Sequence, residues 1–154
     1  MKVEYNKLPY YRTKVPIYKT QNDIRKILMK FGLKGTRFTE YNNIGVIEFI
    51  LEKIGKEMAF RFKFDIPKKG TEQSQVYRAL YHYLKNRFAA VEFGITSIEE
   101  EFLQELVLKL PNGSDITVKE LVQDQLDSLE YESKLLLPFE VKKKWALQQI
   151  NGTC

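Results

Sequence analysis

The sequence predicts an α+β protein in which a helix, a three-stranded antiparallel meander and a long helix precede two or three C-terminal helices. Three observations lead to this prediction: a segment with apolar residues at helical spacing, then strand-like segments separated by short turns, then a long amphipathic segment. A chain of 154 residues has the size of one domain. We expect a basic, tyrosine-rich arm over residues 1–19, the folded domain over 20–134, and a C-terminal appendage with a short helix over 135–154.

The first helix is predicted from apolar residues at helical spacing between Ile24 and Phe31. Thr20 is the expected N-cap, and Asp23, three residues later, completes a variant of the capping box. Gly32 is the expected stop, because glycine readily adopts the left-handed conformation that ends helices.

Three strands are expected next, over residues 37–41, 46–51 and 58–66, with turns at Asn42-Asn43 and around Gly55. The last strand alternates most clearly between apolar and polar residues, so one of its faces belongs to the core. That face is formed by Met58, Phe60, Phe62, Phe64 and Ile66.

A long helix is predicted over residues 72–92, with Gly94 as its stop. Its expected buried stripe consists of Val76, Leu80, Tyr83, Leu84, Phe88 and Val91. Capping boxes at Ser97 with Glu100 and at Thr117 with Glu120 predict two further helices, separated by a tight turn over 110–113. The first of these carries Phe102, Leu103 and Leu106, and a last short helix is expected from Pro138.

Charge is distributed unevenly along the chain. Residues 1–90 contain 19 Lys and Arg against 8 Asp and Glu, a net charge of +11, and residues 91–154 contain 6 against 12, a net charge of −6. A surface built this way attracts polyanions on one side and repels them on the other, which favours a nucleic-acid partner.

Two groups of residues are candidate nucleic-acid contacts. Six cations lie close together in the sequence and are expected to form one phosphate-binding surface: Arg61, Lys63, Lys68, Lys69, Arg78 and Lys85. In the arm, Tyr10 and Tyr11 adjoin Arg12 and Lys14, a pattern typical of proteins that stack the bases of single strands. The alternatives are an ordinary solvated surface for the cations and tyrosines that pack on the sheet.

The residues give no signature of a cofactor, a metal site or a catalytic group. His82 is the only histidine and shares an exposed helical stripe with Arg78 and Lys85, without a cysteine nearby to complete a zinc site. The run Glu99-Glu100-Glu101 is expected to be the favourable first turn of a helix rather than a metal site.

Among enzymes, the alternative is a metal-dependent nuclease that uses Glu48, Glu52 and Asp65 with Lys53 or Lys63. The spacing of these residues does not form a recognisable signature. The order helix, three strands, helix is also that of double-stranded-RNA-binding domains, but the long helix lacks the basic, alanine-rich start of theirs.

Several short segments follow one another in a distinctive order. They are Arg78-Ala79-Leu80, Ala90-Val91-Glu92, Gly94-Ile95, Glu99-Glu100-Glu101-Phe102-Leu103, and Leu110-Pro111-Asn112-Gly113 with Thr117-Val118. Together with Val15-Pro16 and Phe64-Asp65-Ile66-Pro67, they make residues 14–120 resemble a group of small, uncharacterised proteins of bacteriophages and prophages. The resemblance implies a viral or mobile-element origin and, because that group often accompanies replication and recombination genes, work on DNA. It implies no catalytic residues.

We therefore expect a non-enzymatic nucleic-acid-binding accessory protein of a phage or mobile element, acting in replication or recombination, with single-stranded DNA preferred. The acidic C-terminal helices would bind the basic face of another copy, giving a homo-oligomer, or a basic protein partner. The alternative is a protein-interaction module, an inhibitor or regulator of a host protein, that works through those helices. The single cysteine, Cys154, and the lack of a signal or membrane-spanning segment favour a cytoplasmic protein without a membrane partner.

Overall fold

The computed structural model describes residues 3–127. The chain divides into two compact units, residues 1–123 and 124–154. The contacts described below belong to the first unit. The helix expected from Pro138 and the appendage expected over 135–154 lie outside the described residues.

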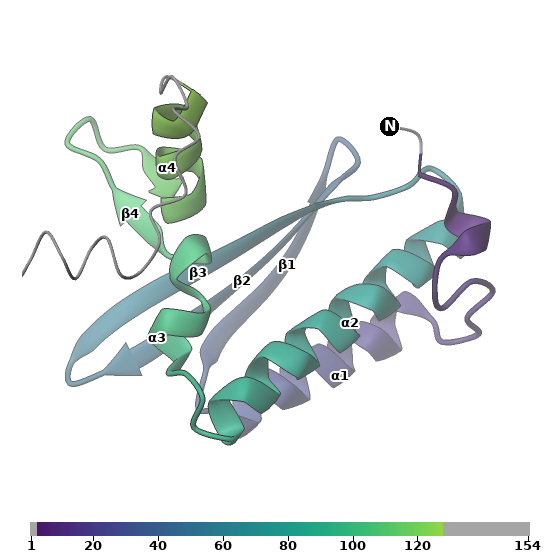
Figure 1. Cartoon of the computed structure of the whole chain (residues 1–154), viewed down its shortest axis with the longest axis horizontal. Helices are drawn as coiled ribbons and strands as arrows, with labels where there is room; N and C mark the ends of the chain where they lie inside the picture. Colours follow the sequence, from purple (N-terminus) through teal and green to yellow (C-terminus); the bar gives the residue numbers. More distant parts are fainter. Residues whose placement is uncertain (1–2, 128–154) are drawn as a thin grey trace, which may run out of the picture. The chain divides into compact units, whose positions relative to one another are not determined.

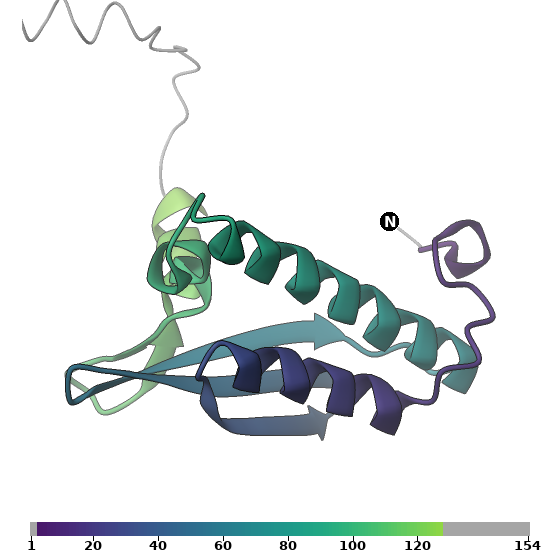
Figure 2. The ribbon, with the colours of Figure 1, turned by 90° about the horizontal axis from the view of Figure 1, so that it is seen from below.

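The predicted α+β fold is confirmed. A 3-10 turn, η1 (Tyr5–Lys7), precedes helix α1 (Ile17–Lys30), strands β1 (Lys34–Tyr41), β2 (Ile44–Lys53) and β3 (Lys56–Asp65), and helix α2 (Gly70–Glu92). Then come α3 (Ile98–Glu101), η2 (Leu103–Glu105), the hairpin of β4 (Val107–Lys109) and β5 (Asp115–Thr117), and α4 (Val118–Asp127). Helices α1 and α2 run side by side along one face of the sheet (Figures 1 and 2).

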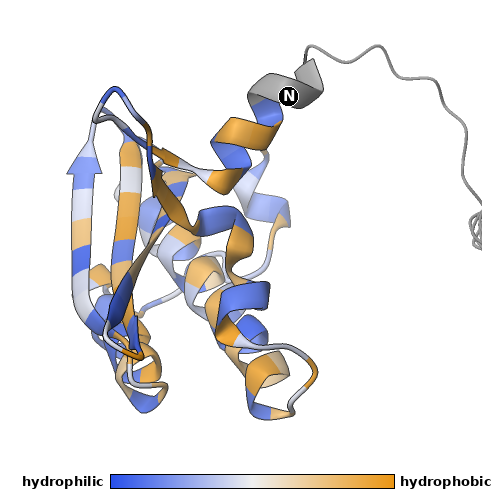
Figure 3. Cartoon of the chain, turned by 90° about the vertical axis from the view of Figure 1, so that its left-hand side faces the viewer, coloured by the Kyte–Doolittle hydropathy of each residue, from blue (hydrophilic) through white to orange (hydrophobic). Residues whose placement is uncertain are grey.

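The three long strands form an antiparallel sheet in the order β1-β2-β3. Asn42-Asn43 and Ile54-Gly55 connect them, and all four residues have positive φ, which matches the turn to the twist of the sheet. Apolar and polar residues alternate along the strands, as the hydropathy colours of Figure 3 show. The predicted alternation of β3 is confirmed, with Phe60 and Phe62 buried and Arg61 and Lys63 on the other face.

The core lies between the sheet and the two long helices. It includes Ile24 and Leu28 of α1, Leu84 and Phe88 of α2, and the alternate residues of β2 and β3. Phe102 is fully buried, and its ring meets the rings of Phe49, Phe60, Phe62 and Phe88. Burial of this one ring fixes the segment after α3 against the sheet.

The start of α1 differs from the prediction. The helix begins at Ile17, directly after Pro16, and Thr20 is fully buried inside it with no hydrogen-bond partner for its hydroxyl. Proline tolerates a helix start because its φ is fixed near the helical value and it has no N–H to leave unpaired. The prediction that Thr20 caps this helix is therefore wrong, whereas the stop at Gly32, with φ of 75°, is confirmed.

The predicted buried stripe of α2 is confirmed at Leu84 and Phe88 and is wrong at Tyr83. Its fully buried side chains are Gln75, Tyr77, Leu84 and Phe88, whereas Tyr83 is 50% exposed. The segment after Ser97 also differs, since its helix lasts only four residues before η2 and β4. Both predicted capping boxes and the tight turn that joins β4 to β5 are confirmed.

None of the described helices combines the length and the apolar character needed to cross a membrane.

Candidate nucleic-acid interface

Gln75 anchors the N-terminal arm to the start of α2. This side chain is 2% exposed, and its amide nitrogen donates to the backbone oxygens of Tyr5 at 2.9 Å, Leu8 at 3.2 Å and Pro9 at 2.8 Å. Because three carbonyls converge on one amide group, a single side chain fixes the path of the arm across α2.

Tyr10 extends from this anchor and stacks on α2. Its ring is parallel to that of His82, with 4.6 Å between the centroids and 2° between the planes. Tyr10 remains 38% exposed and Tyr11 43% exposed. The arm thus places Tyr10 on the solvent side of α2, not on the sheet.

The backbone of the arm is held in a costly conformation. Tyr10 and Arg12 have φ of 64° and 58°. Left-handed conformations at non-glycine residues cost about 1–3 kcal/mol each and persist only where surrounding contacts fix them. The hydrogen bonds from Gln75 and the stack on His82 supply such contacts.

Cations surround the stack on α2. Arg78 and Lys85 lie one turn before and one turn after His82. The Arg78 guanidinium lies over the ring of Tyr81 at 4.3 Å and is 3.2 Å from the carboxylate of Asp23. Lys85 is exposed, and within residues 3–127 it makes no ion pair.

The surroundings of His82 lower its pKa. Partial burial lowers the pKa of His82, and the charges of Arg78 and Lys85 lower it further. The lowered pKa favours the neutral form of the ring that stacks on Tyr10.

The arm adds two further cations. Arg12 places its guanidinium 5.3 Å from the ring centre of Tyr11. Arg12 and Lys14 are both exposed, and neither has an ion-pair partner among the described residues. Exposed tyrosines and unneutralised cations therefore occur together on the arm.

Lys69 joins this group from the start of α2. It forms a loose ion pair with Glu72 at 3.6 Å and lines one hollow with Tyr11. Lys68 is exposed beside it and is not ion-paired to any residue of the described part. We call the combined region the arm–helix surface; it consists of Tyr10, Tyr11, Arg12, Lys14, Lys68, Lys69, Arg78, His82 and Lys85.

Arg61 and Lys63 do not belong to the arm–helix surface. They lie on the face of the sheet that points away from α2. The side chain of Arg61 donates to Glu48 at 2.8 Å, and Lys63 is ion-paired with Glu120 of α4. The expected single surface of six cations is therefore not formed.

The acidic later part of the chain neutralises cations of the basic part within the fold. Arg87 is the most buried example, since its side chain is 13% exposed and binds both Glu101 and Glu105 at 2.9 Å. Three further pairs bridge the two parts of the sequence: Lys30 with Glu92, Lys53 with Glu99, and Lys63 with Glu120. The charge asymmetry of the sequence thus contributes to internal pairing, and these carboxylates are not free for a basic partner or a second copy.

The carboxylates considered for a nuclease do not converge. Arg61 and Arg37 both bind Glu48; burial raises the pKa of Glu48, but these hydrogen bonds lower it by more. Glu48 of β2 lies opposite Arg61 of β3. Asp65 lies four residues further along β3, and this length of strand is about 13 Å. No group of three or more His, Cys, Asp or Glu among the described residues could hold a metal ion.

Gln75 and Tyr81 are not among the residues that the sequence singles out. A glutamine inside an amphipathic helix has no distinctive spacing, so its role as an anchor becomes visible only from its three carbonyl partners. The sequence predicts that His82 is an exposed member of a cationic stripe, but its stacking on Tyr10 has no signal in the sequence.

Comparisons of the chain with protein-family models, with curated proteins and with solved structures give no match. The resemblance to phage and prophage proteins is an expectation from the sequence alone.

Proposed function

We propose that this protein is a non-enzymatic nucleic-acid-binding accessory protein that holds single-stranded DNA on the arm–helix surface. The observation that carries the proposal is the parallel stack of Tyr10 on His82. It brings Tyr10 of the arm to the stripe of α2 that carries Arg78 and Lys85, and Tyr11 shares a hollow with Lys69.

The two kinds of side chain have separate roles. Arg12, Lys14, Lys68 and Lys85 contact phosphates, because no described carboxylate neutralises them. Arg78 and Lys69 contribute less, since each has a carboxylate partner. With four phosphate contacts, a plot of the logarithm of the binding constant against the logarithm of the salt concentration should have a slope of about −3.

Tyr10 and Tyr11 provide the stacking platform. An exposed aromatic ring accepts any base, and stacking contributes about 1–3 kcal/mol per base. Bases in a duplex are paired and stacked on one another, so these rings favour a single strand. The expected setting, replication or recombination of a phage or mobile element in the host cytoplasm, rests on the sequence resemblance.

Fluorescence anisotropy with a labelled oligothymidine of 20 nucleotides tests the proposal. We expect binding at 50 mM salt, the stated salt slope, and weaker binding to a duplex of the same length. Lys85→Glu should weaken binding about tenfold, which is about 1.4 kcal/mol.

Lys56→Glu is the matched control, because Lys56 is also exposed and has no ion pair with a described residue but follows the Ile54-Gly55 turn. It should change the affinity less than about twofold, or about 0.4 kcal/mol. An absence of binding at 50 mM salt, or equal losses in the two variants, would overturn the proposal.

A further inference from the structure

Strand β3 is an edge of the sheet that is nearly unpaired. In the described part of the chain, the only pairing on its outer side is an isolated bridge between Phe60 and Leu106. Beyond Phe60, toward Asp65, the outer edge of β3 has no strand beside it within residues 3–127. Such an edge is a template for another strand.

The direction of the backbone groups follows from the turn. In a hairpin with a two-residue turn, the two residues that flank the turn form a hydrogen-bonded pair. Along the strands, hydrogen-bonded pairs then alternate with pairs that are not hydrogen-bonded. Lys53 and Lys56 are the first such pair, so the backbone N–H and C=O groups of the even-numbered residues of β3 point toward β2. The N–H of Ile66 donates to Asn43 at 2.7 Å, in the same alternation. The N–H and C=O of Lys63 therefore point outward.

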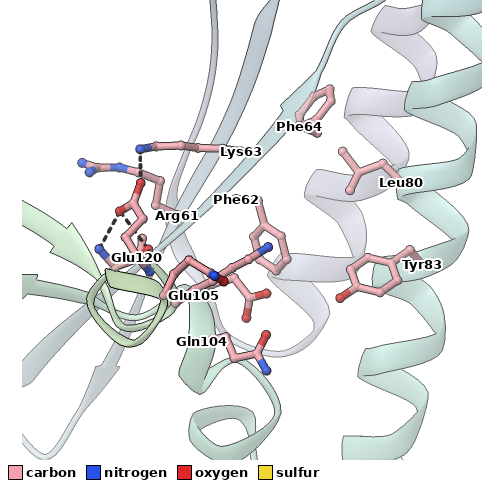
Figure 4. Close-up of a pocket in the computed structure, with 12 residues that line it drawn as sticks. Arg61, Phe62, Lys63, Phe64, Leu80, Tyr83, Gln104, Glu105 and Glu120 are labelled. Carbon is pink, nitrogen blue, oxygen red and sulfur yellow. Dashed lines mark hydrogen bonds and ion pairs between the residues drawn. The ribbon is translucent and has the colours of Figure 1, made fainter. Parts of the chain in front are cut away.

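A groove of about 390 Å³ lies along this outward edge, between β3, α2 and residues of η2, β5 and the start of α4 (Figure 4). Its apolar lining consists of Phe62 and Phe64, which flank Lys63, and of Leu80 and Tyr83 from α2. Tyr83 is half exposed, so the groove opens to solvent on the side of α2. Side chains of a strand added at Lys63 would enter this groove on the side of Phe62 and Phe64.

The walls of the groove are fixed before any partner binds. The Phe64 ring lies over Gly45, where a Cβ atom would overlap it, and meets the ring of Tyr77 edge-on. Arg87 donates a hydrogen bond to the Tyr83 hydroxyl at 3.0 Å, and Arg87 also donates to the carboxylate of Glu105. A preformed groove keeps the entropic cost of binding low.

The charge on the rim indicates which segment fits. Lys63 and Glu120 neutralise each other, but Lys119 lines the same groove, is exposed, and has no ion pair with a described residue. If a strand binds in the groove, a carboxylate close to its apolar side chains would lie beside Lys119, which has no carboxylate partner in the described part of the chain.

We propose that this groove binds an extended acidic–apolar segment of a partner protein, which adds to the sheet along β3. The segment hydrogen-bonds to the backbone of Lys63, inserts two apolar side chains separated by one residue, and carries a carboxylate that reaches Lys119. None of the groove residues belongs to the arm–helix surface, so the inference is independent of nucleic-acid binding. An accessory protein of this kind would hold DNA and a partner protein at the same time.

Selection from a displayed library of random seven-residue peptides on the immobilised full chain tests the inference. We expect enrichment of peptides with apolar residues at alternate positions and an acidic residue. The best peptide, made synthetically, should lose at least tenfold in affinity for Lys63→Pro, because proline removes the outward N–H without breaking a bond to β2.

Two variants serve as controls. Lys63→Met keeps the backbone donor and removes the charge, and Glu57→Pro removes an outward N–H away from the groove. Glu57→Pro should bind the peptide within about threefold of the wild type. Lys63→Met leaves Glu120 without its partner, as Lys63→Pro also does, and should still bind the peptide at least fivefold more tightly than Lys63→Pro. No enrichment, or equal binding by Lys63→Pro, would overturn the inference.

Amide hydrogen exchange of the wild type tests the same contact without any variant. The Lys63 amide should exchange rapidly in the free protein and become at least tenfold slower when the peptide saturates it. Unchanged exchange contradicts the inference. Protection that rises with protein concentration alone would show that a second copy occupies the edge, which also contradicts it.

Discussion

The rings of Tyr10 and His82 lie parallel, with 4.6 Å between their centroids. This contact joins an arm that precedes the fold to the middle of its longest helix. Without it, the tyrosine–cation pattern of the arm and the cationic stripe of α2 would be two unrelated features. With it, they form one surface whose two kinds of side chain suit the two parts of a nucleotide.

Gln75→Leu should release the arm. The substitution keeps the size of the side chain but removes the donor shared by three carbonyls, so the arm loses about 1–3 kcal/mol of docking free energy. Limited proteolysis should cleave the arm faster, and the affinity for oligothymidine should fall. Gln73→Leu is the control, since Gln73 donates only to the carbonyl of Pro67. Equal protease resistance in the two variants would show that Gln75 does not hold the arm.

Arg87→Met should destabilise the fold by about 3 kcal/mol. The guanidinium is mostly buried, lies 4.3 Å from the ring centre of Phe102 and binds Glu101 and Glu105, which would be left without their partner. Urea unfolding measures the loss. Arg37→Met removes an arginine whose side chain is 70% exposed and should cost at most about 1 kcal/mol. A similar cost for both variants would contradict the central role of Arg87.

Glu120 should make stability depend on acid pH. Burial raises its pKa, but hydrogen bonds from Lys63 and Thr117 lower it by more, to about 2, whereas its ordinary value is 4.5. The stabilisation is therefore fully present above pH 4.5 and is lost as the pH falls towards 2. Because the side chain is 38% exposed, we expect about 1 kcal/mol.

Urea unfolding of the wild type and Glu120→Gln at several pH values checks this. The difference in the free energy of unfolding should be largest at pH 7 and should shrink between pH 4.5 and pH 2. A difference that stays constant over that interval would mean that the ionised Glu120 contributes nothing.

Gly45→Ala should displace the Phe64 ring. The new methyl group would overlap this ring, so the ring must move into the groove beside β3 or away from Tyr77, at a cost of about 1–3 kcal/mol. Thermal unfolding should show the loss. Gly70→Ala is the matched control, because no atom lies within 4 Å of the added Cβ. If both variants unfold at the same temperature, the Phe64 ring does not depend on Gly45.

Local signals in the sequence were sufficient for the sheet. The alternation of β3 and the two short turns specify strands, register and core face together, because a slip of one residue would expose Phe60 and Phe62. The start of α1 was not predictable in the same way. Thr20 has the chemistry of a cap, but Ile17 extends the helix past it and places Thr20 in the interior.

The candidate site was predictable only in part. The arm pattern is local, so the sequence indicates it directly. Arg61 is neutralised by Glu48 and Lys63 by Glu120, and Glu120 becomes a neighbour of Lys63 only in the folded chain, because α4 is far from β3 in the sequence. Counting charges along a chain does not show which cations will meet a carboxylate, and this is why the predicted basic surface is split.

The most direct test of the account is an NMR titration of the isotopically labelled chain with a short oligothymidine. We predict that the largest amide shift changes occur at Tyr10, Tyr11, His82 and Lys85 on the arm–helix surface. Changes centred on Arg61 and Lys63 of β3, or no changes at low salt, would contradict it.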